Sequence, residues 1–177
     1  PVSRSEILLG KFLGHAAILA FATLCGYGAV GAAAAFTESG DAESWRAFAG
    51  LLASSVILGL AFLAIAYLVS VLVSERSTAA GLAVAIWLVL VIVYDLALMG
   101  MLVASKGGVG ADIFPSLLLA NPADAYRLFN MSASAGAAVY SGMAGPGTAT
   151  GLPAGSLLAA LTAWVLAPLA LAVLAFQ

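Results

Sequence analysis

The sequence predicts an all-α fold, a polytopic bundle of helices that crosses a membrane several times. Of its 177 residues, 64% are hydrophobic and 8% are charged, with a formal net charge of −2. Soluble domains carry roughly three times as many charged residues, so this chain could not cover its surface in water. Six Lys and Arg residues against eight Asp and Glu leave no cationic surface for nucleic acid. We therefore expect a membrane protein that does not bind nucleic acid.

Four segments are long and apolar enough to span a bilayer. Residues 12–37, 47–74 and 128–177 contain no Asp, Glu, Lys or Arg, and residues 77–105 contain only Asp95. A helix needs about 20 apolar residues to cross the hydrocarbon core, where its backbone must satisfy its own hydrogen bonds. The predicted transmembrane helices cover residues 12–36, 47–73, 78–104 and 154–176.

The segment before the first span carries a helix start signal. Ser3 and Glu6 fit a capping box, in which each side chain bonds the other residue's backbone amide. A helix over residues 4–36 would be about 50 Å long, against about 30 Å of hydrocarbon core. We expect residues 1–11 to lie outside the lipid, bent near Gly10 as an elbow helix. An ordinary helix start and an elbow that docks a partner both fit this pattern.

Small residues recur at one-turn spacing along the same helix. They are Gly10, Gly14, Ala22 and Gly26. Small side chains at this spacing let a second helix approach closely. We therefore expect close helix packing on this face.

Polar connections separate the first three spans. The connection at residues 37–44 carries Glu38, Asp41 and Glu43, which fit either a solvated loop or a patch that docks a partner. Trp45 and Arg46 then mark a membrane interface. Residues 74–78 are short enough to form a tight hairpin. Three of the six Lys and Arg residues fall on each side of the membrane, so the positive-inside rule gives no orientation.

The long connection at residues 105–153 is expected to contain short helices, because a connection of this length without structure is uncommon. Asn121 fits an N-cap, Pro122 the first helical position and Asp124 the first turn of a helix that ends near Met131. The Gly-, Ala- and Ser-rich stretch that follows is expected to be loosely packed. In the last span, Pro168 should produce a kink.

Asp95 is the one carboxylate inside a predicted span, and Tyr94 precedes it. Ionisable residues within a membrane are costly and mark ion paths, relays or partners. A gating role and a structural hydrogen bond to a neighbouring helix both fit Asp95. Met99, one turn further on, joins these two residues as a candidate for a translocation path.

Catalytic and metal chemistry find little support in the sequence. Tyr94-Asp95 and the Gly108–Asp112 segment resemble the two motifs of intramembrane aspartyl proteases, but the second reads GxGxD, one residue too long, and follows the same helix. His15, Cys25 and four Met residues do not stand at metal-ligand spacing. A single cysteine excludes a disulfide framework. No P-loop, GxSxG, HExxH or CxxC occurs, so we expect no catalytic residue, metal or cofactor here.

The first eleven residues, PVSRSEILLGK, resemble a segment of ABC-2 type permeases. Residues 7–15, 77–83 and 121–128 are more particularly similar to permeases that serve nitrous-oxide reductase maturation. The similarity extends over nearly the whole chain. It implies six spans, of which this chain, which begins at Pro1, would hold the last four. Residues 74–78 would then be cytoplasmic, and residues 37–46 and 105–153 periplasmic.

The resemblance also implies partners and a process. The permease would form a homodimer in the bacterial inner membrane, with a cytoplasmic ATPase similar to NosF that holds ATP and Mg²⁺. A periplasmic protein similar to NosD would complete the complex. The process would be assembly of the copper–sulfide centre of nitrous-oxide reductase, with a sulfur species, copper or no cargo carried. A generic ABC-2 exporter of lipid or small hydrophobic substrates and a purely mechanical assembly subunit are the alternatives.

Residues and resemblance together assign three sets of candidate site residues. Coupling to the ATPase is expected for Pro1, Ser3, Arg4, Glu6 and Lys11. Translocation or gating is expected for Tyr94, Asp95 and Met99. Contact with the periplasmic partner is expected for Glu38, Asp41, Glu43, Asn121, Asp124, Tyr126 and Arg127.

Overall fold

The computed structural model describes residues 2–37, 42–105, 113–133 and 152–176. Over these ranges every regular element is a helix. Four helical segments are long and apolar enough to cross a membrane. The predicted all-α membrane bundle is therefore confirmed.

The helices follow the predicted spans closely. The three long single helices are α1 (Arg4–Thr37), α2 (Ala42–Leu72) and α8 (Ala154–Ala175). The third span consists of α3 (Arg76–Leu88), the π-helical turn η1 (Val89–Val93) and α4 (Tyr94–Ala104). Two short helices, α5 (Phe114–Leu119) and α6 (Pro122–Ala133), lie in the long connection, as predicted.

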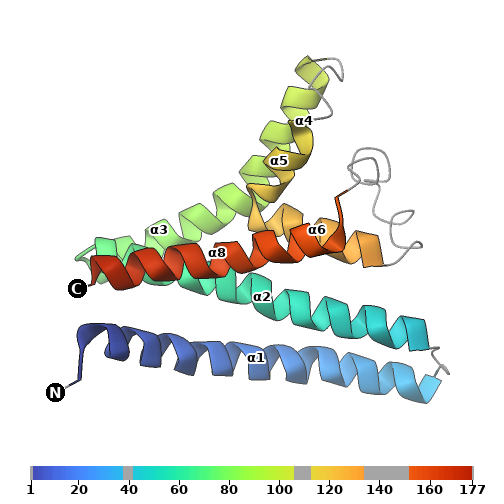
Figure 1. The fold of residues 1–177 in the computed structure, drawn as a ribbon, viewed down its shortest axis with the longest axis horizontal. Coiled ribbons are helices and arrows are strands. Elements are labelled where there is room, and N and C mark those ends of the chain that lie inside the picture. Colours follow the sequence, from blue (N-terminus) through green and yellow to red (C-terminus); the bar gives the residue numbers. More distant parts are fainter. Residues whose placement is uncertain (1, 38–41, 106–112, 134–151, 177) are drawn as a thin grey trace.

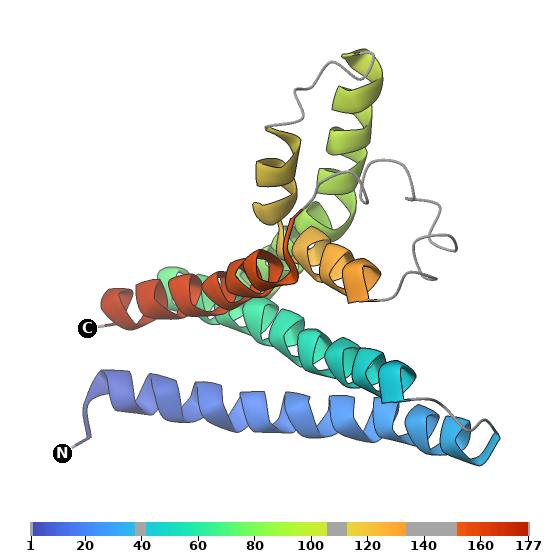
Figure 2. The ribbon, with the colours of Figure 1, turned by 45° about the vertical axis from the view of Figure 1, so that its right-hand side comes forward.

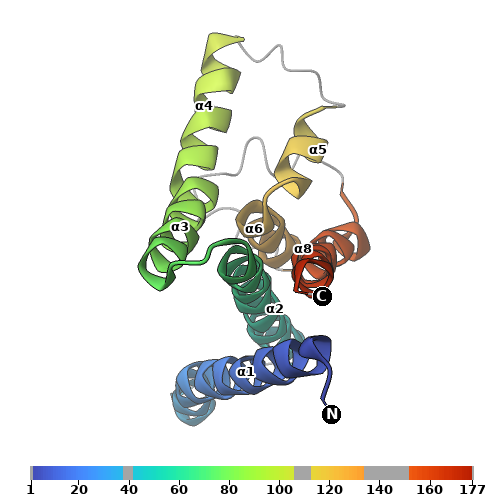
Figure 3. The ribbon, with the colours of Figure 1, turned by 90° about the vertical axis from the view of Figure 1, so that its left-hand side faces the viewer.

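Helix α2 is central to the bundle. It packs against α1 on one side and α8 on the other, with α6 near its first half (Figures 1 and 3). The chain ends, the last turn of α2 and the start of α3 lie at one end of the bundle. Partway along the bundle, α4 and α5 turn away from the remaining helices, and α6 lies where they diverge (Figure 2). This junction brings the third span and the long connection together.

Two clusters of buried apolar residues hold these elements. One joins α4, α5, α6 and α8 through Leu98, Leu118, Leu128 and Leu157. The other joins α2 and α3 through Ile65, Val69 and Ala79. Many other large apolar side chains of the spans are exposed, as expected of helices that face lipid or further protein.

The capping box at the start of α1 is confirmed. The Ser3 amide donates to Glu6 Oε2 at 2.7 Å, and the Glu6 amide donates to Ser3 Oγ at 3.3 Å. The bend expected near Gly10 is not a break in this structure, because α1 is a continuous helix from Arg4 onwards. Helix α8 likewise continues through Pro168.

The predicted packing face on α1 contacts no other helix among the described residues of this chain. A Cβ built on Gly10, Gly14 or Gly26 would meet no atom within 4 Å. The close approach of α1 and α2 occurs instead at Gly31, where a Cβ would lie 2.9 Å from the Phe48 ring, and at Gly59, 2.9 Å from Leu19. The one-turn spacing of small residues therefore did not identify the glycines that lie against a helix within this chain.

A matched pair of alanine substitutions should separate these two kinds of glycine. Gly59→Ala is expected to lower the thermal unfolding midpoint, because its methyl group would lie 2.9 Å from Leu19 Cδ2 and the Leu19 side chain must leave its present position. Gly26→Ala, in open space, is expected to leave the midpoint unchanged or raise it, because Ala favours helix more than Gly. Circular dichroism of the two variants in detergent would measure this, and equal midpoints would contradict the close approach at Gly59.

Candidate functional site

Asn121 organises the junction between α6 and the third span. Its side chain is fully buried, at 0% exposure. As the predicted N-cap, its Oδ1 accepts the Ala123 amide at 3.1 Å. Its Nδ2 donates to the Leu90 carbonyl at 2.8 Å and to Asp124 Oδ2 at 2.9 Å. One amide side chain therefore caps α6 and attaches it to η1.

The π-helical turn η1 supplies the backbone acceptors for this attachment. A π turn widens the helix and disturbs the regular i→i−4 ladder, which makes carbonyl groups accessible to side chains. Asn121 bonds to the Leu90 carbonyl, and Arg127 Nη2 donates to the Val91 carbonyl at 3.4 Å. The irregular turn thus lies where the long connection docks on the span.

Arg127 lies between two carboxylates. Its Nη1 is ion-paired with Asp95 of α4 and donates to Asp124 Oδ1 at 3.2 Å. Arg127 and Asp95 are about one-third exposed, whereas Asp124 is only 3% exposed. The intramembrane carboxylate singled out in the sequence therefore has its cationic partner in α6. The gating candidate Asp95 and three of the partner-contact candidates, Asn121, Asp124 and Arg127, form one network.

Burial raises the pKa of the Asp124 carboxyl to about 7, and the neighbouring Asp95 carboxyl acts in the same direction. The bonds from Asn121 and the charge of Arg127 act against this shift. The folded protein therefore holds a proton on Asp124 more tightly than the unfolded chain, whose pKa is near 3.8. Stability must fall as the pH rises from about 4 to about 7, and this group adds no further pH dependence above that range.

Asp124→Asn should remove this pH dependence. Asp124 accepts Arg127 at Oδ1 and Asn121 at Oδ2. An asparagine keeps one of these two acceptor oxygens, yet does not titrate. The variant is expected to gain stability relative to the parent protein as the pH rises from about 4 to about 7 and to keep a constant difference above that range, measured as unfolding midpoints from pH 4 to pH 8. Glu75→Gln is the control with the opposite sign, because hydrogen bonds from Ser77 and Thr78 lower the pKa of Glu75. A constant difference between Asp124→Asn and the parent from about pH 4 to about pH 7 would contradict the shift.

Two further side chains tie α5 to the spans. The Tyr94 hydroxyl donates to the Leu117 carbonyl at 2.8 Å. Trp164 Nε1, on α8, donates to the Leu119 carbonyl at 3.3 Å. Tyr94 therefore acts here as an anchor between α4 and α5. Trp164 was not singled out in the sequence, where a tryptophan in an apolar span gives no sign of its partner.

A second polar set joins α6 to α2 and α1. Ser55 Oγ lies 2.9 Å from the Tyr126 hydroxyl oxygen and 3.4 Å from that of Tyr27. Asn130 Nδ2 donates to Ser54 Oγ at 3.0 Å. Tyr126, expected at a partner surface, thus faces inward. The adjacent serines within an apolar run are the signal that could have identified this contact, because small polar residues bond neighbouring helices in membranes.

The remaining predicted site residues lie apart from this junction. Ser3, Arg4, Glu6 and Lys11 are exposed at the first turns of α1. Met99 is 59% exposed on α4 and is not part of the network. Glu43 belongs to the first turn of α2. Pro1, Glu38 and Asp41 lie outside the described residues, as does the Gly108–Asp112 segment.

Buried Asn121 and Asp124 leave no side-chain surface that a partner protein could touch in this structure. In the described ranges, no three His, Cys, Asp or Glu residues are grouped as a metal site, and Cys25 is exposed. Asp95 forms an ion pair with Arg127, so the network connects helix α4 to helix α6.

Comparisons with known proteins agree with this architecture. Residues 1–177 match the family described as "ABC-2 family transporter protein". The chain is 42% identical over 179 residues to the "Probable ABC transporter permease protein NosY" of Stutzerimonas stutzeri, covering 100% of this chain and 65% of that relative. It is 44% identical over 174 residues to the protein of the same name from Pseudomonas aeruginosa, covering 97% and 63%. The chain therefore spans less than two thirds of the length of these relatives. It belongs to the ABC-2 family of membrane-spanning transporter permeases.

Proposed function

We propose that this chain is part of the permease subunit of an ATP-driven transporter that supports assembly of the copper–sulfide centre of nitrous-oxide reductase. The two relatives named NosY support this assignment, at 42% and 44% identity over nearly all of the chain. The partners are a NosF-like cytoplasmic ATPase, a NosD-like periplasmic protein and a second permease copy.

The Asn121–Asp124–Arg127 contact with the third span is the observation that carries the mechanism. It fixes the α5–α6 segment to η1 and α4 through hydrogen bonds and an ion pair. A movement of the third span must therefore displace α6, unless these bonds break. The junction converts rearrangement within the membrane into movement of the segment that faces the periplasm in the proposed orientation.

A continuous series of contacts leads to this junction from the start of α1. Phe12 packs edge-on against Tyr67 with ring centroids 5.5 Å apart, and His15 Nδ1 lies 2.7 Å from the Tyr67 hydroxyl oxygen. Nearer the start of α2, Ser54 and Ser55 form hydrogen bonds with Asn130 and Tyr126 of α6. ATP binding would move the first turns of α1, and rigid helices would pass the displacement to α6.

The junction favours mechanical transmission over binding of cargo within it. Its polar groups are bonded to one another, and within the described ranges no buried side-chain nitrogen or oxygen lacks a partner. A cargo group would have to displace an existing bond to enter. The third span and α6 therefore act on a sulfur species, copper or periplasmic partner located elsewhere in the complex.

Deletion of the full-length gene in a denitrifying host tests the assignment. Nitrous-oxide reductase purified from that host should lack its copper–sulfide centre by spectroscopy and sulfide analysis, while its other copper centre remains. Restoration by the plasmid-borne gene is the control. If both centres are intact in the deletion strain, a generic ABC-2 exporter of lipid or small hydrophobic substrates becomes the better assignment.

Replacing Arg4 and Glu6 together should uncouple ATP hydrolysis from maturation. Both side chains are exposed, so the double substitution Arg4→Ala/Glu6→Ala should leave the permease inserted and the ATPase bound. ATP hydrolysis by the purified complex would persist, whereas the copper–sulfide content of the reductase would fall several-fold. Arg46→Ala is the matched control, because Arg46 lies in the first turns of α2, at the end of the bundle opposite to Arg4 and Glu6. Normal copper–sulfide content in the double variant would remove the coupling role of this segment.

A further inference from the structure

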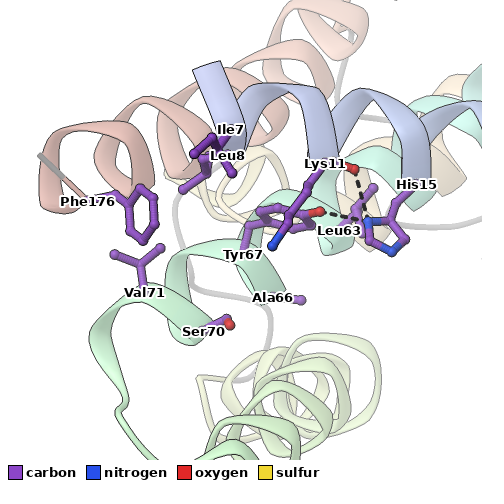
Figure 4. Close-up of a pocket in the computed structure, with 10 residues that line it drawn as sticks. All are labelled: Ile7, Leu8, Lys11, His15, Leu63, Ala66, Tyr67, Ser70, Val71 and Phe176. Carbon is purple, nitrogen blue, oxygen red and sulfur yellow. Dashed lines mark hydrogen bonds between the residues drawn. The ribbon is translucent and has the colours of Figure 1, made fainter. Parts of the chain in front are cut away.

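A pocket of about 410 Å³ opens between α1, α2 and the end of α8 (Figure 4). Lys11 and His15 contribute from α1, Tyr67 and Ser70 from α2, and Phe176 closes one side. It lies at the end of the bundle that holds both chain ends, away from the Arg127 junction. None of the bonds in that junction involves these residues.

The polar side of the pocket suits an anion. Lys11 is positively charged, and none of the ten lining residues is Asp or Glu. Glu6, the nearest acidic residue along α1, is turned to Ser3, whose amide and hydroxyl both donate to Glu6 Oε2. His15 uses Nδ1 for its contacts with Tyr67 and the Lys11 carbonyl. In the described part of the chain, the Lys11 ammonium group is thus the cation that faces a ligand in this pocket.

The remaining lining is apolar and lies at the edge of the hydrocarbon core. Leu8, which is buried, lines the pocket from α1, and Leu63 and Val71 line it from α2. Lys11 immediately precedes the first uncharged run, and Phe176 follows the last turn of α8. Charged residues at the ends of spans reach toward the headgroup region of the bilayer. The pocket therefore combines a cation and hydroxyl groups at headgroup level with an apolar wall.

We propose that this pocket binds the phosphate of an anionic phospholipid, with the acyl chains against its apolar wall. A free inorganic anion would use Lys11, Tyr67 and Ser70 but not the apolar wall. A zwitterionic lipid would use the wall but would bring its own positive charge toward Lys11. In the orientation proposed above, the lipid belongs to the cytoplasmic leaflet, beside the first turns of α1. The binding itself does not depend on that orientation.

Native mass spectrometry of the full-length permease, delipidated in detergent, tests the proposal. The probes are phosphatidylglycerol, phosphatidylcholine with the same acyl chains, and inorganic phosphate as a competitor. Phosphatidylglycerol should bind more tightly than phosphatidylcholine. Lys11→Gln should weaken phosphatidylglycerol binding by about fivefold, since one basic residue near an anionic headgroup has an effect of this size. Tyr67→Phe keeps the ring packing and should also weaken binding.

Arg76→Gln is the matched control, because it removes one positive charge at the same end of the bundle, outside the pocket. It should leave the affinity for phosphatidylglycerol unchanged. Equal losses in Lys11→Gln and Arg76→Gln would overturn the proposal in favour of non-specific attraction. Equal affinity for the two lipids would also overturn it. Displacement of phosphatidylglycerol by millimolar phosphate would make the pocket a small-anion site.

Discussion

Replacing Arg127 by methionine is expected to destabilise the permease by about 2 kcal/mol at pH 8. The change leaves the Asp95 and Asp124 carboxylates adjacent without a cation, and Asp124 is only 3% exposed. Breaking a fully buried ion pair by removing one partner costs about 3–5 kcal/mol, and the one-third exposure of Arg127 and Asp95 reduces that figure. The bond to the Val91 carbonyl is lost as well.

The same substitution should be less costly at pH 6, because Asp124 can then take up a proton. Thermal unfolding of the full-length variant in detergent at the two pH values would measure both effects. Arg127→Lys should fall between parent and methionine variant, because lysine keeps the charge but not the planar fork that reaches Asp95 and Val91. Arg46→Met removes an exposed arginine that, among the described residues, donates to the Ala42 carbonyl. An equal loss in Arg46→Met and Arg127→Met would contradict the ion-pair network.

Arg127→Met also separates stability from function. If the junction transmits movement, nitrous-oxide reductase from a strain that carries Arg127→Met should contain little copper–sulfide centre, even at a growth temperature where the permease remains folded. Immunoblots of the membrane fraction would show that the variant is present. Full assembly of the centre with the ion pair removed would exclude Arg127 from transmission.

Signals that depend on neighbouring residues could be interpreted correctly from the sequence. Three uncharged runs and a fourth that contains only Asp95 identified the four spans, since a span needs about 20 mostly apolar residues irrespective of tertiary contacts. The Ser3–Glu6 capping box and the Asn121–Pro122 start of α6 were also found, because a cap is satisfied within one helical turn. The caps depend on residues a few positions apart, and each span depends on the composition of one continuous segment.

The partners of Asp95 could not be predicted in the same way. Arg127 is 32 positions from Asp95, and Asn121 is 31 positions from the Leu90 carbonyl. The carbonyl is accessible in a π-helical turn, and the VLVIV sequence of that turn carries no residue that breaks a helix. Its position follows from the bonds that α6 makes with it, which are tertiary interactions. Sequence therefore indicated two separate sites, on the span and on the connection, where the structure has one.

Replacing Asn121 by alanine is expected to cost about 3 kcal/mol, because three hydrogen bonds of about 1 kcal/mol each are lost from a fully buried group. The Leu90 carbonyl and the Ala123 amide would both be left without these partners. Unfolding midpoints of full-length variants in detergent would measure the loss.

Asn121→Asp distinguishes the cap from the attachment to η1. Aspartate keeps an oxygen for the Ala123 amide but cannot donate to the Leu90 carbonyl when ionised, and it places a second negative charge beside Asp124. At pH 8 it should therefore be at least as unstable as Asn121→Ala, whereas a variant that lacked only the cap would lose about 1 kcal/mol. At pH 6 it should recover part of the loss, because a shared proton removes the repulsion and restores one donor. Stability equal to that of the parent at pH 8 would show that α6 is held to the span by Arg127 alone.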